Sequence, residues 1–159
     1  MRIFSLRLLM AFVVVIIFTL PALAGRTLDM SKGQKVYVPV YSHVYQGPKS
    51  RSYNLSALLS IRNVDAKHSI TITSVKYYND NGEMVNNYLD SPIVVSPMGT
   101  KEFYIPERNI EGGSGANFTV QWEGGTEMST PIIQAVMIGT ASTQGISFVC
   151  DGVVIEEYE

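Results

Sequence analysis

Apolar and polar side chains alternate along short segments of this chain, and this period of two constrains the fold more than any other feature. Phe118, Val120 and Trp122, for example, alternate with Thr119 and Gln121. Because successive side chains of a β-strand point to opposite faces, such alternation is typical of a strand with one buried face. No window carries apolar residues at helical spacing over three turns. We therefore expect an all-β fold.

The alternating segments are short, and residues that favour turns separate them. We expect strands over residues 36–44, 55–61, 70–77, 83–89, 93–95, 102–105, 118–123, 132–138, 146–150 and 153–157. Short strands at such regular spacing are typical of two antiparallel sheets that pack face to face. The expected fold is an antiparallel two-sheet sandwich, immunoglobulin-like or related, formed by one domain over residues 36–159.

Three local signals predict how the chain turns. Asn79-Asp80-Asn81-Gly82 is a strong turn sequence, and Asp151-Gly152 is the best two-residue hairpin signal in the chain. Between Ile72 and Val75 the apolar residues change from even to odd positions. This change of phase predicts a bulge near Thr73–Ser74, because one extra residue exchanges the two faces of a strand.

Two segments predict their own place within a sheet. Pro39 has no amide hydrogen to donate, so the strand over residues 36–44 is expected at a sheet edge. Residues 132–138 form a nearly continuous apolar run, which favours a central strand that is buried on both faces.

Residues 1–24 have the features of a cleavable secretory signal peptide. Arg2 and Arg7 give a basic start, residues 8–20 are an apolar run, and Ala22-Leu23-Ala24 provides small residues at the expected cleavage point. The run is short for a membrane span, which needs about 20 residues; an uncleaved anchor is the alternative and would be the chain's contact with a membrane. We expect cleavage after Ala24, export to the periplasm or extracellular space, and a flexible polar lead-in over residues 25–35.

Charge and cysteine content exclude several classes of function. The chain has 12 Lys and Arg residues against 14 Asp and Glu, and the basic residues are scattered. Nucleic acids and anionic lipid surfaces are recognised by clustered basic residues, so neither is an expected partner. Cys150 is the single cysteine, which excludes an intramolecular disulfide and leaves the core to stabilise the domain.

Residues with catalytic or metal-binding chemistry are few and far apart in the sequence. The two histidines, His43 and His68, fit no metal-binding spacing, and a site would need further ligands. Cys150 ends a strand and has no helix N-terminus to activate its thiol, so we expect a small buried residue rather than a nucleophile. The sequence predicts no catalytic residue, no cofactor and no metal.

Aromatic residues recur on one face of the first expected strand. Tyr37, Tyr41 and Tyr45 lie on this face with His43, opposite a row of valines. If the face is exposed, it is a tyrosine-rich edge suited to a protein strand or a sugar ring; if it is covered, the tyrosines belong to the core. The Gly112-Gly113-Ser114 loop is the second candidate surface, either a plain surface loop with positive φ or a backbone nest for an anion.

Four segments spread over the chain carry a family resemblance: KVYVPVYSHVY at 35–45, LSIRNVDAKHSITITSVKYY at 59–78, GGSGANFTVQW at 112–122 and IIQAVMIGTASTQGISF at 132–148. They resemble the bacterial domain of unknown function 3124. The resemblance implies a small exported bacterial protein, and it implies no activity, cofactor or catalytic residue.

The functional expectation is an exported, non-catalytic envelope protein that acts as a protein-interaction module through edge-strand addition. The alternative is a small-ligand or carbohydrate-binding protein, which would need a concave pocket with convergent polar groups. An enzyme is the third reading and would need a titratable group with a shifted pKa in a cleft.

Overall fold

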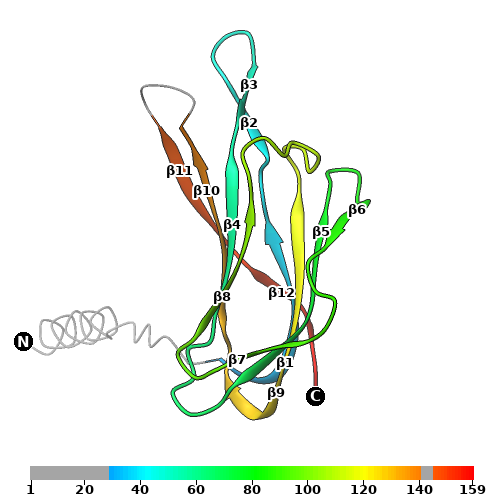
Figure 1. The fold of residues 1–159 in the computed structure, drawn as a ribbon, viewed down its shortest axis with the longest axis vertical. Coiled ribbons are helices and arrows are strands. Elements are labelled where there is room, and N and C mark those ends of the chain that lie inside the picture. Colours follow the sequence, from blue (N-terminus) through cyan, green and yellow to red (C-terminus); the bar gives the residue numbers. More distant parts are fainter. Residues whose placement is uncertain (1–28, 141–144) are drawn as a thin grey trace, which may run out of the picture.

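The computed structural model describes residues 29–140 and 145–159, which form two antiparallel β-sheets facing each other (Figure 1). The expected all-β sandwich is confirmed. The predicted signal peptide over residues 1–24 and the start of the expected lead-in lie outside the described residues. Within the described ranges there is no helix of sufficient length and hydrophobicity to cross a lipid bilayer.

The strands are β1 (Met30–Pro39), β2 (His43–Gln46), β3 (Arg51–Asn54), β4 (Ser56–Arg62), β5 (Ile70–Tyr78), β6 (Met84–Asn87), β7 (Ile93–Val95), β8 (Thr100–Ile105), β9 (Asn117–Ser129), β10 (Ile132–Gly139), β11 (Ile146–Asp151) and β12 (Val153–Glu157). The first sheet has the order β12-β1-β9-β5-β6, with β7 also paired to β5. The second sheet has the order β11-β10-β4-β8. The strands β2 and β3 pair only with each other.

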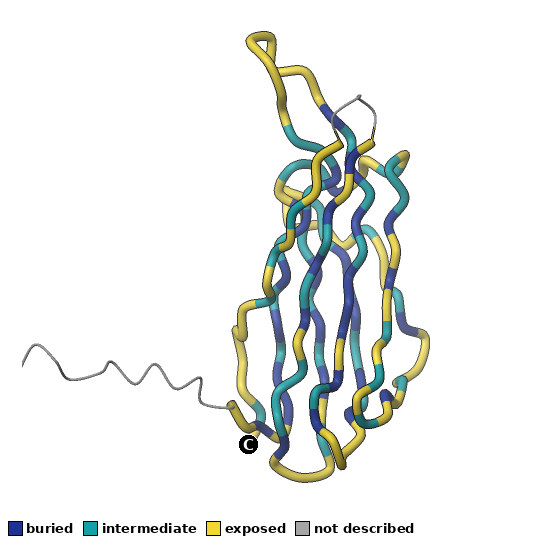
Figure 2. Tube along the Cα trace, turned by 90° about the vertical axis from the view of Figure 1, so that its left-hand side faces the viewer, coloured by how far each residue is buried: buried dark blue, intermediate teal, exposed yellow. Residues whose placement is uncertain are grey.

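The core lies between the two sheets, where inward-facing side chains from both are buried (Figure 2). In β9, Phe118, Val120 and Trp122 are fully buried and alternate with more exposed residues, as their period of two predicts. Tyr77 of β5 and Leu59 of β4 are also fully buried. This interior takes the place of a disulfide as the source of stability.

Two local predictions on β5 are confirmed. The register between β5 and β9 shifts between Ile72 and Ser74, where the change of phase predicted a bulge. The Asn79–Gly82 turn joins β5 to β6: the Asn79 side-chain oxygen accepts hydrogen bonds from the backbone N–H groups of Asn81 and Glu83. Gly82 has φ of +80°, a conformation that glycine adopts without steric cost.

The Asp151-Gly152 hairpin prediction is wrong. β11 pairs with β10 in one sheet, whereas β12 pairs with β1 in the other, so the chain crosses between sheets at Gly152. A Cβ atom on Gly152 would lie 2.6 Å from Val36 Cγ1 and 2.8 Å from the Ile133 carbonyl oxygen. Glycine is needed here for close approach of the backbone, and not for a positive φ.

The structure corrects one prediction about burial and one about strand position. Residues 132–138 lie in β10, which is central, but the face that carries Ile132 and Ile138 is open to solvent. The strand that contains Pro39 lies inside a sheet, between β12 and β9, and Pro39 is tolerated because the β12 pairing ends at Tyr37.

The expected flexible lead-in over residues 25–35 is corrected from Met30 onward. β1 begins at Met30, and Ser31 and Gln34 are buried although both are polar. The Ser31 hydroxyl donates to the Gly33 carbonyl, and the Gln34 amide donates to Glu157 Oε2 at 2.9 Å. The Ser31 bond is local, whereas the Gln34 bond comes from β12 at the far end of the chain. Together they satisfy two of the polar side chains whose presence predicted a loop.

Candidate functional site

The predicted tyrosine-rich edge does not exist as one continuous strand. β1 ends at Pro39 and β2 starts at His43, so Tyr37, Tyr41 and Tyr45 lie on three different segments. Tyr37 and Tyr41 are half-buried, and the Tyr41 ring packs edge-on against Phe148 at 5.6 Å between centroids. Tyr45 alone is exposed, with 62% of its surface accessible.

The structure instead brings both candidate surfaces to one end of the sandwich. The Val40 N–H donates to the Ala116 carbonyl and the Ser42 N–H donates to the Gly113 carbonyl, each at 2.9 Å. The segment that carries Tyr41 therefore lies against the loop that carries Gly112, Gly113 and Ser114.

A buried hydroxyl pair anchors this end. Ser42 Oγ and the Tyr77 hydroxyl are 2.9 Å apart, and both residues are buried. Desolvation by burial raises the pKa of Tyr77, while the hydrogen bond from Ser42 acts in the opposite direction. A side chain on Gly112 would collide with the Tyr77 hydroxyl, so glycine is required for this packing.

The glycine-rich loop is a packed surface loop. The Gly113 N–H donates to the Ile110 carbonyl at 3.1 Å, and Gly112 accepts from the Asp80 N–H at 3.1 Å. Gly113 has φ of +76°, and the carboxylate of Asp80 lies where its side chain would be. Of the two readings of this loop, the contacts favour the plain one, because an anion would meet the Asp80 carboxylate.

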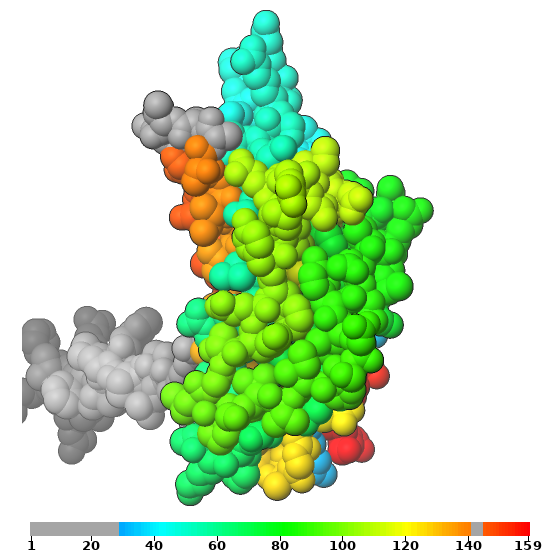
Figure 3. Space-filling view, in the orientation of Figure 1, coloured from blue at the N-terminus to red at the C-terminus, as the bar shows by residue number. Residues whose placement is uncertain are grey.

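Strands β2 and β3 form a hairpin that projects beyond both sheets (Figures 1 and 3). Their register runs from His43 opposite Asn54 to Gln46 opposite Arg51. His43 Nε2 lies 3.3 Å from the Tyr45 hydroxyl, and the two rings meet edge to face at 5.2 Å. We call this element, residues 43–54, the projecting hairpin.

The tip of the projecting hairpin is basic. Lys49 and Arg51 are exposed, and within the described ranges neither forms an ion pair with a carboxylate. Together with Gln46, Gly47 and Pro48 they line a shallow hollow of about 390 Å³. No strand was predicted between residues 44 and 55, because Arg51-Ser52-Tyr53-Asn54, which forms β3, has no clear apolar alternation.

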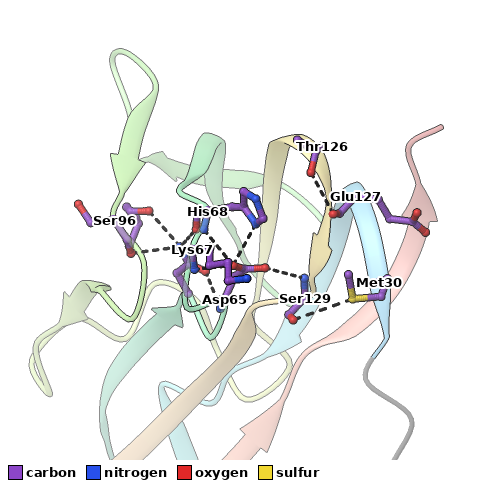
Figure 4. A network of polar contacts seen from close by, with 10 residues as sticks. Met30, Asp65, Lys67, His68, Ser96, Thr126, Glu127 and Ser129 are labelled. Atoms are coloured by element: carbon purple, nitrogen blue, oxygen red, sulfur yellow. Dashed lines mark hydrogen bonds and ion pairs between the residues drawn. The ribbon is translucent and has the colours of Figure 1, made fainter.

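His68 lies at the other end of the sandwich, in a network around Asp65 (Figure 4). Asp65 Oδ1 accepts hydrogen bonds from the backbone N–H groups of Lys67 and His68, and Oδ2 accepts one from Ser129. These bonds, the Lys67 one foremost, lower the pKa of Asp65 from 3.8 to about 2. The network ties the β4–β5 connection to the end of β9, which is a structural role.

Cys150 is partly buried on β11 and packs against the core. Desolvation raises the pKa of its thiol, and the neighbouring Asp151 raises it further. A raised pKa lowers the fraction of thiolate, which is the reactive form of cysteine. In the part of the chain that the structure describes, no three His, Cys, Asp or Glu side chains are grouped to hold a metal ion.

A cavity of about 670 Å³ opens between the sheets beside Gly152, and no pattern in the sequence predicted it. Its lining combines apolar residues such as Val36, Ile133 and Val154 with the polar Gln34 and Arg62. It forms where β11 separates from β10. The pairing ends at Gln134 opposite Asp151, so Ile132 and Ile133 at the start of β10 have no β11 residue opposite them. A cavity of this origin follows from the sheet exchange, which no local pattern predicts.

Comparisons with known proteins place the chain in a family without a described activity. A family described as "Protein of unknown function (DUF3124)" matches residues 33–155, which confirms the resemblance carried by the four segments. No curated protein matches the sequence. A solved structure, "Crystal Structure of Thermotoga maritima 1070", is similar with a TM-score of 0.47 and 11% identity, over 79% of this chain and 97% of that one.

Proposed function

We propose that this chain, which belongs to the DUF3124 family, is an exported, non-catalytic protein-interaction module of the bacterial envelope. Export is supported by the features of residues 1–24, and a non-catalytic role by the chemistry of the described residues. Burial raises the pKa of the Cys150 thiol, and Asp65 accepts hydrogen bonds from backbone amides. His43 begins β2, whereas His68 lies in the connection between β4 and β5. Function on a sandwich must then come from a surface.

The projecting hairpin is the observation that carries this proposal. A two-stranded hairpin is marginally stable alone in water, and packing of Val44 and Tyr53 against the core holds its base. Beyond this base the hairpin exposes Tyr45, whose ring packs against the half-buried His43. Tyrosine is enriched at interfaces because it provides a large rigid ring with a polar tip.

The charge of the hairpin indicates the kind of surface that it meets. The chain as a whole has a formal charge of −2, whereas Lys49 and Arg51 at the tip pair with no carboxylate among the residues that the structure describes. A basic tip on an acidic molecule orients the hairpin toward an acidic protein surface and speeds encounter. The backbone of β2 is paired on one side only, by β3, so a partner strand can add to its outer edge.

Affinity capture from envelope extracts tests the proposal with two matched charge reversals. The full chain is the bait, alongside Arg51→Glu at the hairpin tip and Lys67→Glu on an exposed loop at the opposite end. We expect a discrete partner that the Lys67→Glu variant retains and the Arg51→Glu variant loses by about tenfold or more. Equal recovery by both variants, or no partner with either bait, would contradict the proposal.

The cavity between the sheets favours ligand binding as a second candidate function. Its volume of about 670 Å³ falls within the usual range for small-molecule sites, and Gln34 and Arg62 offer polar groups within it. A thermal-shift screen with sugars and metal ions tests this directly. A rise in melting temperature that is abolished by Val154→Trp, which fills the cavity, would support it; no rise with any compound would remove it.

A further inference from the structure

The edge strand β11 lacks the features that keep sheet edges apart. Its residues Ile146–Asp151 pair in regular register with β10, without a bulge, and no other described strand pairs with its opposite side. The segment Ile-Ser-Phe-Val-Cys carries no charge and no proline. Natural edges are usually protected by lysine, proline, bulges or short length, so an unprotected edge is a ready template for another strand.

The other edges of the two sheets are protected in these ways. β12 has an irregular register with β1 and carries Glu156 and Glu157. β8 carries Lys101 and Glu102. β6 and β7 are four and three residues long. The contrast singles out β11 as the edge whose sequence permits pairing.

An apolar row crosses the outer face of the second sheet and ends at this edge. Tyr104, Leu58, Val136 and Val149 are cross-strand neighbours on β8, β4, β10 and β11. Val149 is 53% exposed and Tyr104 60% exposed. The rows on either side contain polar residues, so the apolar row is a distinct stripe that reaches the strand edge at Val149.

We propose that a second copy of this chain pairs antiparallel with β11, with Val149 opposite the partner's Val149, to form a continuous eight-stranded sheet. A twofold axis perpendicular to the sheet places the outer faces of both copies on the same side, so two residues that lie opposite each other must point to the same face. This holds only for registers in which the axis passes through one residue that lies opposite itself. Centring on Val149 joins the apolar row of one copy to that of the other. It also places Ser147, a hydroxyl donor, opposite the partner's Asp151 carboxylate.

The neighbouring registers fit less well. Centring on Phe148 places Val149 opposite the partner's Ser147 and leaves Asp151 without a polar partner. Centring on Cys150 places Val149 opposite the partner's Asp151, an apolar side chain against a carboxylate. The Val149 register thus pairs the apolar residue with itself and the hydroxyl with the carboxylate. Because the strand complements itself in this way, we assign a second copy of the chain rather than an unrelated strand. In this register Cys150 faces the partner's Phe148, so the dimer is held without a disulfide.

Cysteine cross-linking of the full chain tests the register. In a Cys150→Ser background, Val149→Cys places two thiols opposite each other at the axis, and mild oxidation with copper phenanthroline should give a disulfide dimer. The matched control Ser147→Cys, in the same background, separates the thiols by four residues along the paired strands, about 13 Å, and should stay monomeric on a denaturing gel.

Sedimentation velocity over a dilution series tests the association itself. We expect Val149→Lys, which brings two like charges together at the axis, to raise the dimer dissociation constant by about tenfold or more. Ser147→Lys, which brings a lysine to the partner's Asp151, should leave the dimer intact. Both positions are exposed, so both variants should fold, and unchanged melting curves check this.

A protein that is monomeric at every concentration would overturn the proposal. A wild-type dimer that dissociates on reduction would also overturn it, because a disulfide between the two Cys150 residues would centre the register on Cys150. The outcome is independent of the projecting hairpin: Arg51→Glu should dimerise as the wild type does. A monomer that still captures a partner through the hairpin would refute this inference alone.

Discussion

Replacing Gly152 by alanine should destabilise the fold, because this residue is where the chain leaves one sheet for the other. A Cβ atom there would lie 2.6 Å from Val36 Cγ1 and 2.8 Å from the Ile133 carbonyl oxygen, and the Gly152 N–H donates to that same carbonyl at 2.8 Å. Backbone on one side and a buried valine on the other leave little room for relaxation. Overpacking of this kind costs roughly 1–3 kcal/mol.

Gly125 provides the matched control, because nothing lies within 4 Å of a Cβ built on it and its φ is not positive. Alanine at such a position stabilises by about 0.4–1 kcal/mol through the entropy of the unfolded chain. Urea unfolding can be followed by the fluorescence of Trp122, the single and fully buried tryptophan. We expect the free energy of unfolding of Gly152→Ala to fall below that of Gly125→Ala by roughly 1.4–4 kcal/mol, the sum of the cost at Gly152 and the gain at Gly125, equivalent to several degrees in melting temperature. Equal stability of the two variants would refute the crossing at Gly152.

Three further perturbations probe the buried polar groups. Ser42→Ala leaves the Tyr77 hydroxyl without its partner and should cost about 1–3 kcal/mol in urea unfolding, with part of the loss recovered when Tyr77→Phe removes the orphaned hydroxyl as well. The pKa of Asp65 is lowered from 3.8 to about 2, so the charged carboxylate stabilises the fold above pH 3.8 and this stabilisation is lost as the pH falls to about 2. Asp65→Asn should therefore lose less stability than the wild type between pH 3.8 and pH 2. The raised pKa and partial burial of Cys150 predict slow reaction with a thiol reagent at pH 8, accelerated many-fold by denaturant; equally fast reaction in both conditions would refute the packing of this thiol.

The fold class followed from the sequence because it depends on local periodicity. Phe118, Val120 and Trp122 alternate in the sequence and are buried together in the structure, and the phase change between Ile72 and Val75 coincides with the register shift of β5. The turn at Asn79–Gly82 also followed, since its side-chain bonds are made within five residues. Features of this kind are decided by neighbours in the chain.

What the sequence did not predict depends on partners far along the chain. Asp151-Gly152 has the composition of a hairpin turn, but β11 and β12 find their partners in different sheets. Pro39 predicted an edge strand, but β1 lies between β12 and β9. Pro39 fits there because the pairing with β12 ends two residues earlier, at Tyr37. The predicted row of tyrosines on one strand face is absent for the same reason. The chain leaves β1 after Pro39 and starts a separate hairpin at His43, so Tyr37 and Tyr45 do not lie on one face despite their equal spacing.

The two candidate segments are far apart in the sequence and adjacent in the structure. Ser42, between Tyr41 and His43, donates to the Gly113 carbonyl, so the two candidate segments lie side by side at one end of the sandwich. The sequence could not indicate that this end carries a projecting hairpin, because Arg51–Asn54 lacks the alternation that marks a buried strand. A strand with little to bury leaves a weak periodic signal, and such strands are the ones available for partners.

Site-specific photo-cross-linking in cells tests the central claim, that the projecting hairpin meets a partner protein. A benzophenone side chain at position 45 replaces the exposed Tyr45, and one at position 84 replaces Met84, which is exposed to a similar extent on the separate β5–β6 hairpin. The account predicts a discrete adduct of defined mass from position 45 and none from position 84. No adduct from position 45, or the same adduct from both positions, would contradict it.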